Sequence, residues 1–113
     1  MGKKGLREFE ELVLLCVLAA GDDAYGAVIQ ATLLEEAGRD SGMGAIYTAL
    51  DRLSQRGLVT SRFGDPTPVR GGRRKRHYTL TPAGLALLAE TRRQREALWA
   101  KAGPMAMDGR SGE

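Results

Sequence analysis

The chain has 113 residues, 42% of them hydrophobic, which fits one small domain with a modest core. It carries 17 Lys and Arg against 14 Asp and Glu, and its single cysteine excludes both an intrachain disulfide and a cysteine metal cluster. The longest apolar run, residues 12–20, is too short to span a bilayer and no signal peptide precedes it, so we expect a cytoplasmic protein.

A first helix is predicted over residues 6–20, because apolar residues recur there at helical spacing. They are Leu6, Phe9, Val13, Cys16, Val17 and Ala20. Cys16 is interpreted as a small core residue. From Leu12 onward Leu15 and Ala19 widen the stripe until almost the whole circumference is apolar. Such a helix needs partners on more than one side, and one of them could be a second subunit.

A second helix is predicted over residues 25–37, with Asp22 or Asp23 as its cap after the break at Gly21. Tyr25 is interpreted as a packing residue. A turn over residues 38–40 leads to a third helix within residues 41–57, which Ser41 would cap.

The third helix has one apolar stripe and a polar remainder. The stripe consists of Ile46, Ala49, Leu50 and Leu53. Gly57 would end this helix, and Leu58 would fold back onto Leu53.

Two strands are predicted over residues 58–63 and 76–80, forming a hairpin with one face on the core. That face would hold Val59, Phe63, Tyr78 and Leu80. The connection is strongly basic, with Arg70, Arg73, Arg74, Lys75 and Arg76. A helix beside a basic finger suits duplex DNA, whose major groove admits a helix and whose phosphates attract arginine. The alternative is a solvated surface loop that is merely basic.

The segments GAIYTALDRLSQRGLV and GGRRKRHYTLTPAG resemble the winged helix-turn-helix of PadR-type transcriptional regulators. The matching positions are Tyr47, Leu50, Leu53, Gly57, Leu58, Val59, Gly71, Gly72, Arg73, Tyr78, Leu80, Thr81 and Gly84. Thr48 departs from the pattern, since many members have proline there. The resemblance implies a mainly α (α+β) fold, with a winged helix-turn-helix DNA-binding domain over residues 1–81, a dimerisation helix over residues 82–102 and a disordered tail over residues 103–113.

The residues expected to contact DNA lie on the third helix and in the wing. They are Met43, Gly44, Ala45, Tyr47, Thr48, Arg52, Arg70, Arg73, Arg74, Lys75, Arg76 and His77. Glycine near the start of the helix would let the backbone approach DNA, and Arg52 could reach a phosphate or a guanine edge. The alternative for Arg52 is an exposed ion pair, for example with Glu35. His77 is expected at the base of the wing, facing solvent or phosphate.

The last helix should begin with Thr81 as cap and Pro82 in its first turn, and run to residue 102. Gly84, Leu87, Thr91, Gln94 and Leu98 recur along it at coiled-coil spacing. In the family such a helix packs against the partner's first helix. The residues expected at a dimer or ligand surface are Phe9, Leu12, Leu15, Leu87, Leu88, Leu98 and Trp99. Trp99 is interpreted as a dimer anchor; the alternative is an aromatic wall for a flat hydrophobic ligand.

The resemblance therefore implies a homodimeric repressor that binds a pseudo-palindrome in double-stranded DNA, with a hydrophobic small-molecule effector as a further option. The competing hypothesis is a winged-helix interaction module that uses its basic wing to bind an acidic protein. An enzyme is not expected, because the sequence has no nucleophile–base pair, no set of metal ligands and no phosphate-binding glycine loop. No cofactor is expected either.

Overall fold

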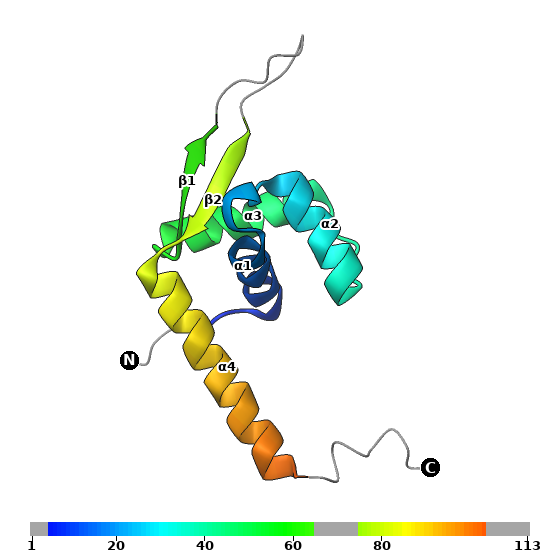
Figure 1. Ribbon diagram of the computed structural model, residues 1–113, viewed down its shortest axis with the longest axis vertical. Helices are drawn as coiled ribbons and strands as arrows, with labels where there is room; N and C mark the ends of the chain where they lie inside the picture. Colours follow the sequence, from blue (N-terminus) through cyan, green and yellow to red (C-terminus); the bar gives the residue numbers. More distant parts are fainter. Residues whose placement is uncertain (1–4, 65–74, 104–113) are drawn as a thin grey trace.

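The computed structural model describes residues 5–64 and 75–103. Its elements follow the predicted order, and three helices gather beside a two-stranded hairpin while a fourth extends away from the hairpin's base (Figure 1). The elements are α1 (Glu8–Ala20), a 3₁₀ turn η1 (Gly21–Asp23), α2 (Gly26–Ala37), α3 (Met43–Gln55), β1 (Val59–Phe63), β2 (Arg76–Leu80) and α4 (Pro82–Ala102). The mainly α fold class is confirmed. Apart from Gly103, the predicted tail lies outside the described residues.

The core lies where α1, α2 and α3 meet, because each of these helices turns its large apolar side chains inward. The largest fully buried side chains are Leu14, Ile29, Leu33, Ile46, Leu50, Leu53, Val13 and Val59. The predicted stripe of α3 is buried in full, and Cys16 is a core residue as expected. Leu14 was not placed in the predicted α1 stripe, yet it is fully buried, whereas its neighbour Leu15 is 42% exposed.

Three glutamates at the start of α1 form ion pairs with three other parts of the chain. Glu8 pairs with Arg39 in the α2–α3 turn at 3.2 Å, and Glu10 lies 3.8 Å from Arg56 at the end of α3. Glu11 binds Arg95 of α4. Carboxylates at a helix N-terminus also interact favourably with the helix dipole. The start of α1 is therefore an attachment point for α3, α4 and the turn before α3.

Two predicted helix caps are wrong. The residue at the N-cap of α3 is Gly42 and not Ser41, whose backbone oxygen instead accepts a 2.8 Å hydrogen bond from Gln30 of α2. The N-cap of α2 is Tyr25, because Asp22 and Asp23 are taken up by the 3₁₀ turn. In both places contacts with the rest of the fold, rather than a local side-chain cap, set where the helix begins.

The predicted end of α3 is confirmed. Gly57 adopts a left-handed φ of 74°, and its N–H donates to Ser54 O at 2.9 Å. The N–H of Leu58 donates to Leu53 O at 2.9 Å, which completes a Schellman motif. Leu53 and Leu58 are both buried. This turn delivers the chain directly into β1.

The two strands are antiparallel, with Val59 opposite Leu80 and Phe63 opposite Arg76. The free edge of β2 is held by Tyr78, whose N–H donates to Ala24 O at 2.8 Å. The prediction that Phe63 faces the core is wrong, since it is 54% exposed. Phe63 is the last residue of β1, at the loop end of the hairpin, and its ring instead packs against the Arg76 guanidinium at 4.7 Å.

The start of α4 is fixed by Thr81 and Gly84. The Thr81 hydroxyl accepts from Gly84 N–H at 3.0 Å and donates to Gly57 O at 2.7 Å, as the predicted cap requires. Gly84 packs tightly against the turn that precedes β1, so a Cβ on Gly84 would lie 2.2 Å from Leu58 O. The predicted end at residue 102 is confirmed. Within the described ranges, no helix has the length and apolar character needed to cross a membrane.

Candidate nucleic-acid interface

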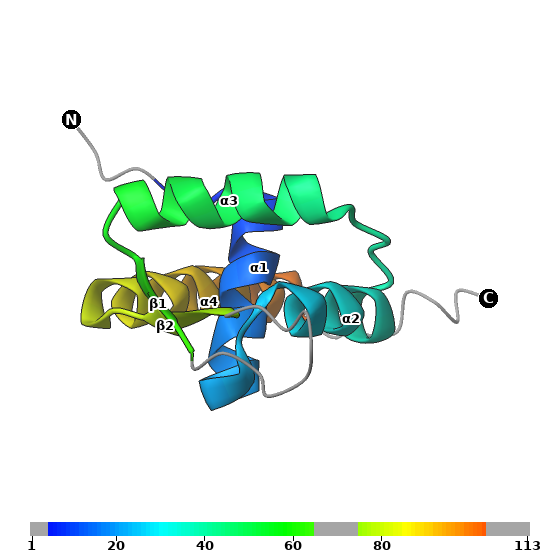
Figure 2. The same ribbon diagram turned by 90° about the horizontal axis from the view of Figure 1, so that it is seen from above.

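One face of α3 is buried and the opposite face is open. Gly44, Thr48 and Arg52 are all exposed and follow one another at four-residue spacing, so they form a line along the helix. Ala45 lies beside this line and is exposed too. Seen from above, α3 runs along one edge of the molecule, in front of α1 (Figure 2). The open face therefore presents small and polar groups followed by one guanidinium.

Arg52 is available for an intermolecular contact. Its side chain forms no ion pair or hydrogen bond with any residue in the described parts of the chain, so the alternative of a pair with Glu35 does not occur. The other charge on this side of α3 is the exposed carboxylate of Asp51. An arginine without a partner keeps all five donors free for phosphate or base acceptors.

A hollow of about 590 Å³ lies between α3, the start of α2 and the loop end of the hairpin. Four residues of the predicted DNA-binding set line it together, namely Met43, Tyr47, Lys75 and Arg76. The rest of its wall comes from Tyr25, Gly26, Ala27, Asp51, Phe63 and Tyr78. The hollow is the point at which α3 and the loop end of the hairpin meet.

Gly26 allows the close approach of α2 and α3 at this hollow. A Cβ on Gly26 would lie 2.5 Å from the Tyr47 hydroxyl and 2.6 Å from the Met43 methyl group. Tyr47 is 40% exposed, with its hydroxyl above the first turn of α2. The first N–H groups of that turn have no side-chain cap. The Tyr47 hydroxyl and these N–H groups are thus donors on one side of the hollow.

The ring of Tyr25 organises the base of the wing. The Lys75 ammonium lies 4.3 Å from its centroid, and the His77 ring meets it edge-on at 5.4 Å. His77 is at the base of the wing as predicted, but it does not simply face solvent or phosphate. Its Nδ1 lies 3.0 Å from the backbone oxygen of Asp22, and since a carbonyl can only accept, Nδ1 is the donor. His77 therefore ties β2 to the turn before α2.

Burial disfavours the charged forms of two titratable groups of the winged helix. Burial raises the pKa of the Tyr78 phenol, although a hydrogen bond with Arg76 and the charge of Arg76 act in the opposite direction. Burial likewise raises the pKa of the Cys16 thiol. Tyr78 thus contributes a neutral hydroxyl to the hollow, and Cys16 is not an activated thiol.

Part of the predicted site lies outside the described residues, namely Arg70, Arg73 and Arg74. Tyr25, Asp51 and Phe63 were not predicted to belong to the site. Only the sequence Tyr25–Gly26 at a helix start carried a signal, because glycine at that point indicates a close approach of another element. Phe63 is exposed because the core covers only the first part of β1, where Val59 is buried. The alternation of apolar and polar residues does not predict how far along the strand the core extends.

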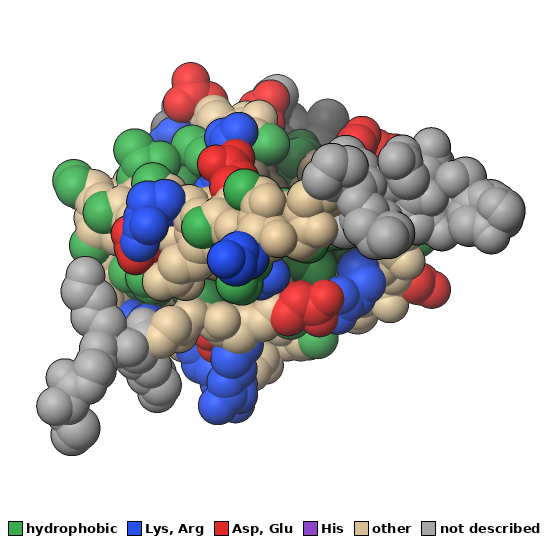
Figure 3. Space-filling model, turned by 90° about the horizontal axis from the view of Figure 1, so that it is seen from below, with side chains coloured by type: hydrophobic (Ala, Val, Ile, Leu, Met, Phe, Trp, Pro, Cys, Tyr) green, Lys and Arg blue, Asp and Glu red, His purple; other side chains and the backbone are tan. Residues whose placement is uncertain are grey.

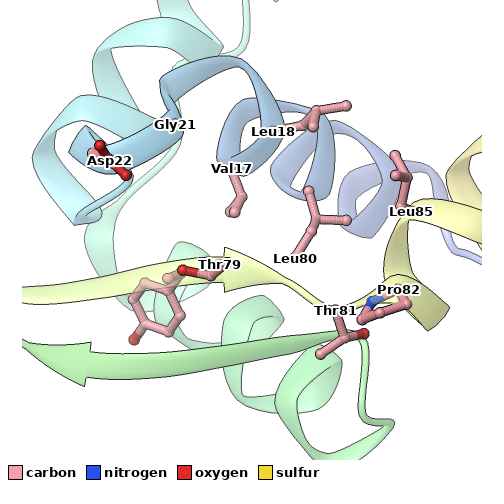
Figure 4. A pocket seen from close by; sticks show the side chains of 10 residues that line it. Val17, Leu18, Gly21, Asp22, Thr79, Leu80, Thr81, Pro82 and Leu85 are labelled. Carbon is pink, nitrogen blue, oxygen red and sulfur yellow. The ribbon is translucent and has the colours of Figure 1, made fainter.

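A second surface lies between α1 and α4 and is apolar. Its exposed residues are Leu15 and Leu18 of α1 and Leu85 of α4; further along α4, Leu98 and Trp99 are 71% and 59% exposed. A hollow of about 450 Å³ opens beside β2, where the side chains of Leu18, Leu80 and Leu85 converge (Figure 4). Leu18 and Leu85 also line an adjoining groove between α1 and α4. The two hollows therefore form one surface, which we call the α1–α4 apolar surface.

The predicted dimer residues divide into two groups. Leu88 is buried in the chain's own core, and Phe9, Leu12 and Leu87 pack against that core. The exposed members are Leu15, Leu98 and Trp99. Viewed from the side where α4 ends, hydrophobic side chains lie exposed among charged ones (Figure 3). Leu18 and Leu85 belong to this surface and were not in the predicted set.

Comparisons with known proteins converge on one family. The model of the transcriptional regulator PadR-like family matches residues 14–90. A transcriptional regulator of Mycobacterium tuberculosis is 38% identical over 96 residues, covering 82% of this chain and 85% of that protein. An uncharacterized 37.1 kDa protein in a Streptomyces fradiae transposon is 36% identical over 78 residues, covering 69% of this chain, which spans only 20% of that protein. Bacillus subtilis PadR, solved in complex with operator DNA, superposes with a TM-score of 0.63 at 27% identity, covering 74% of this chain and 46% of that one.

Proposed function

Because this chain belongs to the PadR-like family of transcriptional regulators, we propose that it is a homodimeric repressor that binds a pseudo-palindromic operator. Members of this family regulate transcription and are not enzymes. The observation that carries the proposal is the open face of α3, which ends in Arg52 and adjoins a hollow lined by Lys75 and Arg76. Arg52 has no ion-pair partner among residues 5–64 and 75–103.

The open face of α3 enters the major groove in this proposal. Gly44, Ala45 and Thr48 let the helix approach the base edges, and Arg52 donates to a phosphate or to a guanine. The hollow between α3 and the hairpin receives the sugar–phosphate backbone, where Tyr47, Lys75 and Arg76 supply donors. Arg70, Arg73 and Arg74, which lie outside the described residues, add to the positive charge that attracts DNA phosphates.

The α1–α4 apolar surface pairs two copies of the chain. From Arg92 to the end of α4 every residue is exposed, so this half of the helix projects beyond its own domain. It carries Leu98 and Trp99, while Leu15, Leu18 and Leu85 lie exposed on and beside α1. Packing the projecting half of α4 against the partner's α1 would cover both sets of apolar side chains at once.

Two-fold symmetry then sets the geometry of DNA recognition. The two copies of α3 should lie about 34–36 Å apart, one turn of duplex, and so read two half-sites. If the dimer neutralises about eight phosphates, its affinity should fall by about 10³–10⁵ between 50 and 200 mM salt. Repression follows from occupying the operator and excluding other proteins from it.

Trp99 provides a place where a small molecule could act. An exposed indole near the dimer centre would stack on a flat hydrophobic compound, although its first role in this proposal is to anchor the dimer. A ligand there would release the operator only by favouring a dimer shape in which the two copies of α3 are misaligned. Since the chain has one tryptophan, binding should quench its fluorescence.

The test is binding to the DNA upstream of the protein's own gene and to an unrelated duplex of equal length, across a salt series. We expect tight, selective and steeply salt-dependent binding to the first. Arg52→Ala should weaken that binding by about 1–3 kcal/mol. Lys101→Ala, which removes the same charge at the end of α4, is the matched control and should have little effect.

Weak binding that is equal on both duplexes would contradict the proposal. The competing hypothesis, an interaction module whose basic wing binds an acidic protein, would then be favoured. In that case charge reversal in the wing should abolish capture of the partner, whereas Thr48→Ala on α3 should leave it unchanged.

A further inference from the structure

The contact of interest is the ion pair between Glu11 of α1 and Arg95 of α4. It is bidentate, with Nε to Oε2 at 3.1 Å and Nη2 to Oε1 at 2.5 Å. The Glu11 side chain is only 12% exposed. The two residues lie 84 positions apart in the sequence, so the pair joins separate parts of the fold. Bidentate arginine–carboxylate pairs fix orientation as well as distance.

This pair is the last of the places where α4 is held, since Leu87 and Leu88 in its first half also pack on the core. The first is its start, where Gly84 packs on Leu58 O and Thr81 bonds to Gly57 O at 2.7 Å. Between Gly84 and Arg95 the helix rises about 16 Å. Beyond Arg92 the residues of α4 are all exposed, and Arg95 alone among them is bonded to α1 in the described structure. A helix that is held only in its first half can change its direction, whereas the additional contact at Arg95 fixes the direction of α4.

We infer that the Glu11–Arg95 pair is a positioning contact that fixes the direction of α4 and thereby the distance between the two DNA-reading helices of the dimer. The inference rests on the proposed function for its second half. Trp99 lies about 22 Å along the helix from Gly84, so a swing of about 10° about Gly84 would move it by about 4 Å. Since that region anchors the partner in the proposed dimer, the same swing changes the separation of the two copies of α3.

The structure contains a matched control for this contact. Glu8 of α1 pairs with Arg39 at 3.2 Å, and this pair also joins α1 to a distant part of the chain. It does not involve α4. The double variants E11Q/R95Q and E8Q/R39Q each remove one ion pair, leave no unpaired charge and keep the net charge unchanged. Only the first removes a contact to α4.

The direction of α4 can be measured without DNA. Spin labels at T48C on α3 and K101C on α4, in a C16A background and diluted with unlabelled protein, report an intramolecular distance by pulsed electron resonance. The unmodified pairs and E8Q/R39Q should give the same narrow distribution, whereas E11Q/R95Q should give a broader or shifted one. An equally narrow and unshifted distribution in E11Q/R95Q would overturn the inference.

A second measurement links the contact to recognition. Duplexes selected from a random library are lengthened or shortened between their half-sites by one to three base pairs. E8Q/R39Q should keep the sharp optimum of the unmodified protein, while E11Q/R95Q should lose it. If only about a tenth of the variant dimers hold the right spacing, affinity at the optimum should fall about tenfold.

The two measurements separate two kinds of failure. If the unmodified protein selects no duplex, the proposed function fails, but the label distances still decide whether the pair directs α4. If E11Q/R95Q broadens the label distances and keeps the sharp spacing optimum, the link to recognition is overturned. Equal dimer affinity in both double variants, measured by sedimentation, confirms that the contact acts on geometry; a loss confined to E11Q/R95Q would overturn the positioning role.

Discussion

The exposed surfaces of α3 and α4 differ in chemistry and in how they are supported. α3 is anchored along its length by Ile46, Ala49, Leu50 and Leu53, and its open face is small and polar. The projecting half of α4 has no such core beneath it and exposes Leu98 and Trp99. A rigid polar face suits a hydrated, charged partner such as DNA, whereas an apolar face on a projecting helix suits another protein chain.

The largest effect is expected where α4 joins the winged helix. Gly84→Ala would place a methyl group 2.2 Å from the backbone oxygen of Leu58, which cannot move without disturbing the turn into β1. We expect a loss of about 3 kcal/mol in the free energy of unfolding, measured by urea denaturation at fixed protein concentration.

Gly5→Ala is the control for this prediction, because nothing lies within 4 Å of a Cβ at that position. Equal stability of the Gly84 variant and the unmodified protein would mean that the start of α4 is not held as tightly as the geometry indicates. The comparison would then change, since the start of α4 would be held no more tightly than its projecting half.

The second prediction concerns the partner of α4. Trp99→Ala should weaken dimerisation by at least about 2 kcal/mol, or about 30-fold, if this indole anchors the interface. Sedimentation equilibrium measures the change. Leu34→Ala is a matched control, since Leu34 on α2 is 53% exposed but lies outside the α1–α4 apolar surface. Equal loss in both variants would indicate nonspecific association.

The sequence predicts α3 better than α4, and the reason is physical. All the apolar side chains in the stripe of α3 pack in the chain's own core, so periodicity alone identified its four buried residues. The hydrophobic residues of α4 lie in two different environments, the core and the exposed surface. Leu88 enters the core while Leu98 is exposed, and spacing along the helix does not distinguish them.

The site shows a similar division. The resemblance identified Met43, Tyr47, Lys75 and Arg76, which the fold brings to one hollow. It did not predict that Tyr25 would contact Lys75 and His77, because those contacts join segments about 50 residues apart through the packing of β2 on the η1 turn. Ser41 failed as a cap for the same reason, since Gln30 of α2 holds its backbone.

A pH titration can sharpen the comparison, because the two groups whose pKa is raised by burial, Cys16 and Tyr78, both belong to the winged helix. Above the ordinary pKa of the thiol, 9.0, the unfolded chain loses a proton that the folded chain keeps. Stability is therefore full below pH 9.0 and falls as the pH rises, by up to about 1.4 kcal/mol per pH unit for each group. Tyr78 adds to the fall above its ordinary pKa of 10.0.

Urea denaturation between pH 7.5 and about pH 11 measures this decline. Cys16→Ala should remove the part that begins near pH 9.0, and Tyr78→Phe the part that begins near pH 10.0. A decline that neither variant reduces would place the titrating groups elsewhere. Dimer affinity measured in parallel shows whether the α1–α4 apolar surface responds as well.

The smallest effect is the most specific to α3. Gly44 is exposed inside the helix with nothing within 4 Å of a Cβ, so Gly44→Ala should stabilise the fold by about 0.5–1 kcal/mol. If the backbone of α3 lies close to DNA there, the same methyl group should lower operator affinity. Opposite signs in stability and binding would identify Gly44 as a position kept small for DNA. A gain in stability with unchanged binding would instead mean that the start of α3 stays clear of the DNA, and that recognition depends on Thr48 and Arg52 further along the helix.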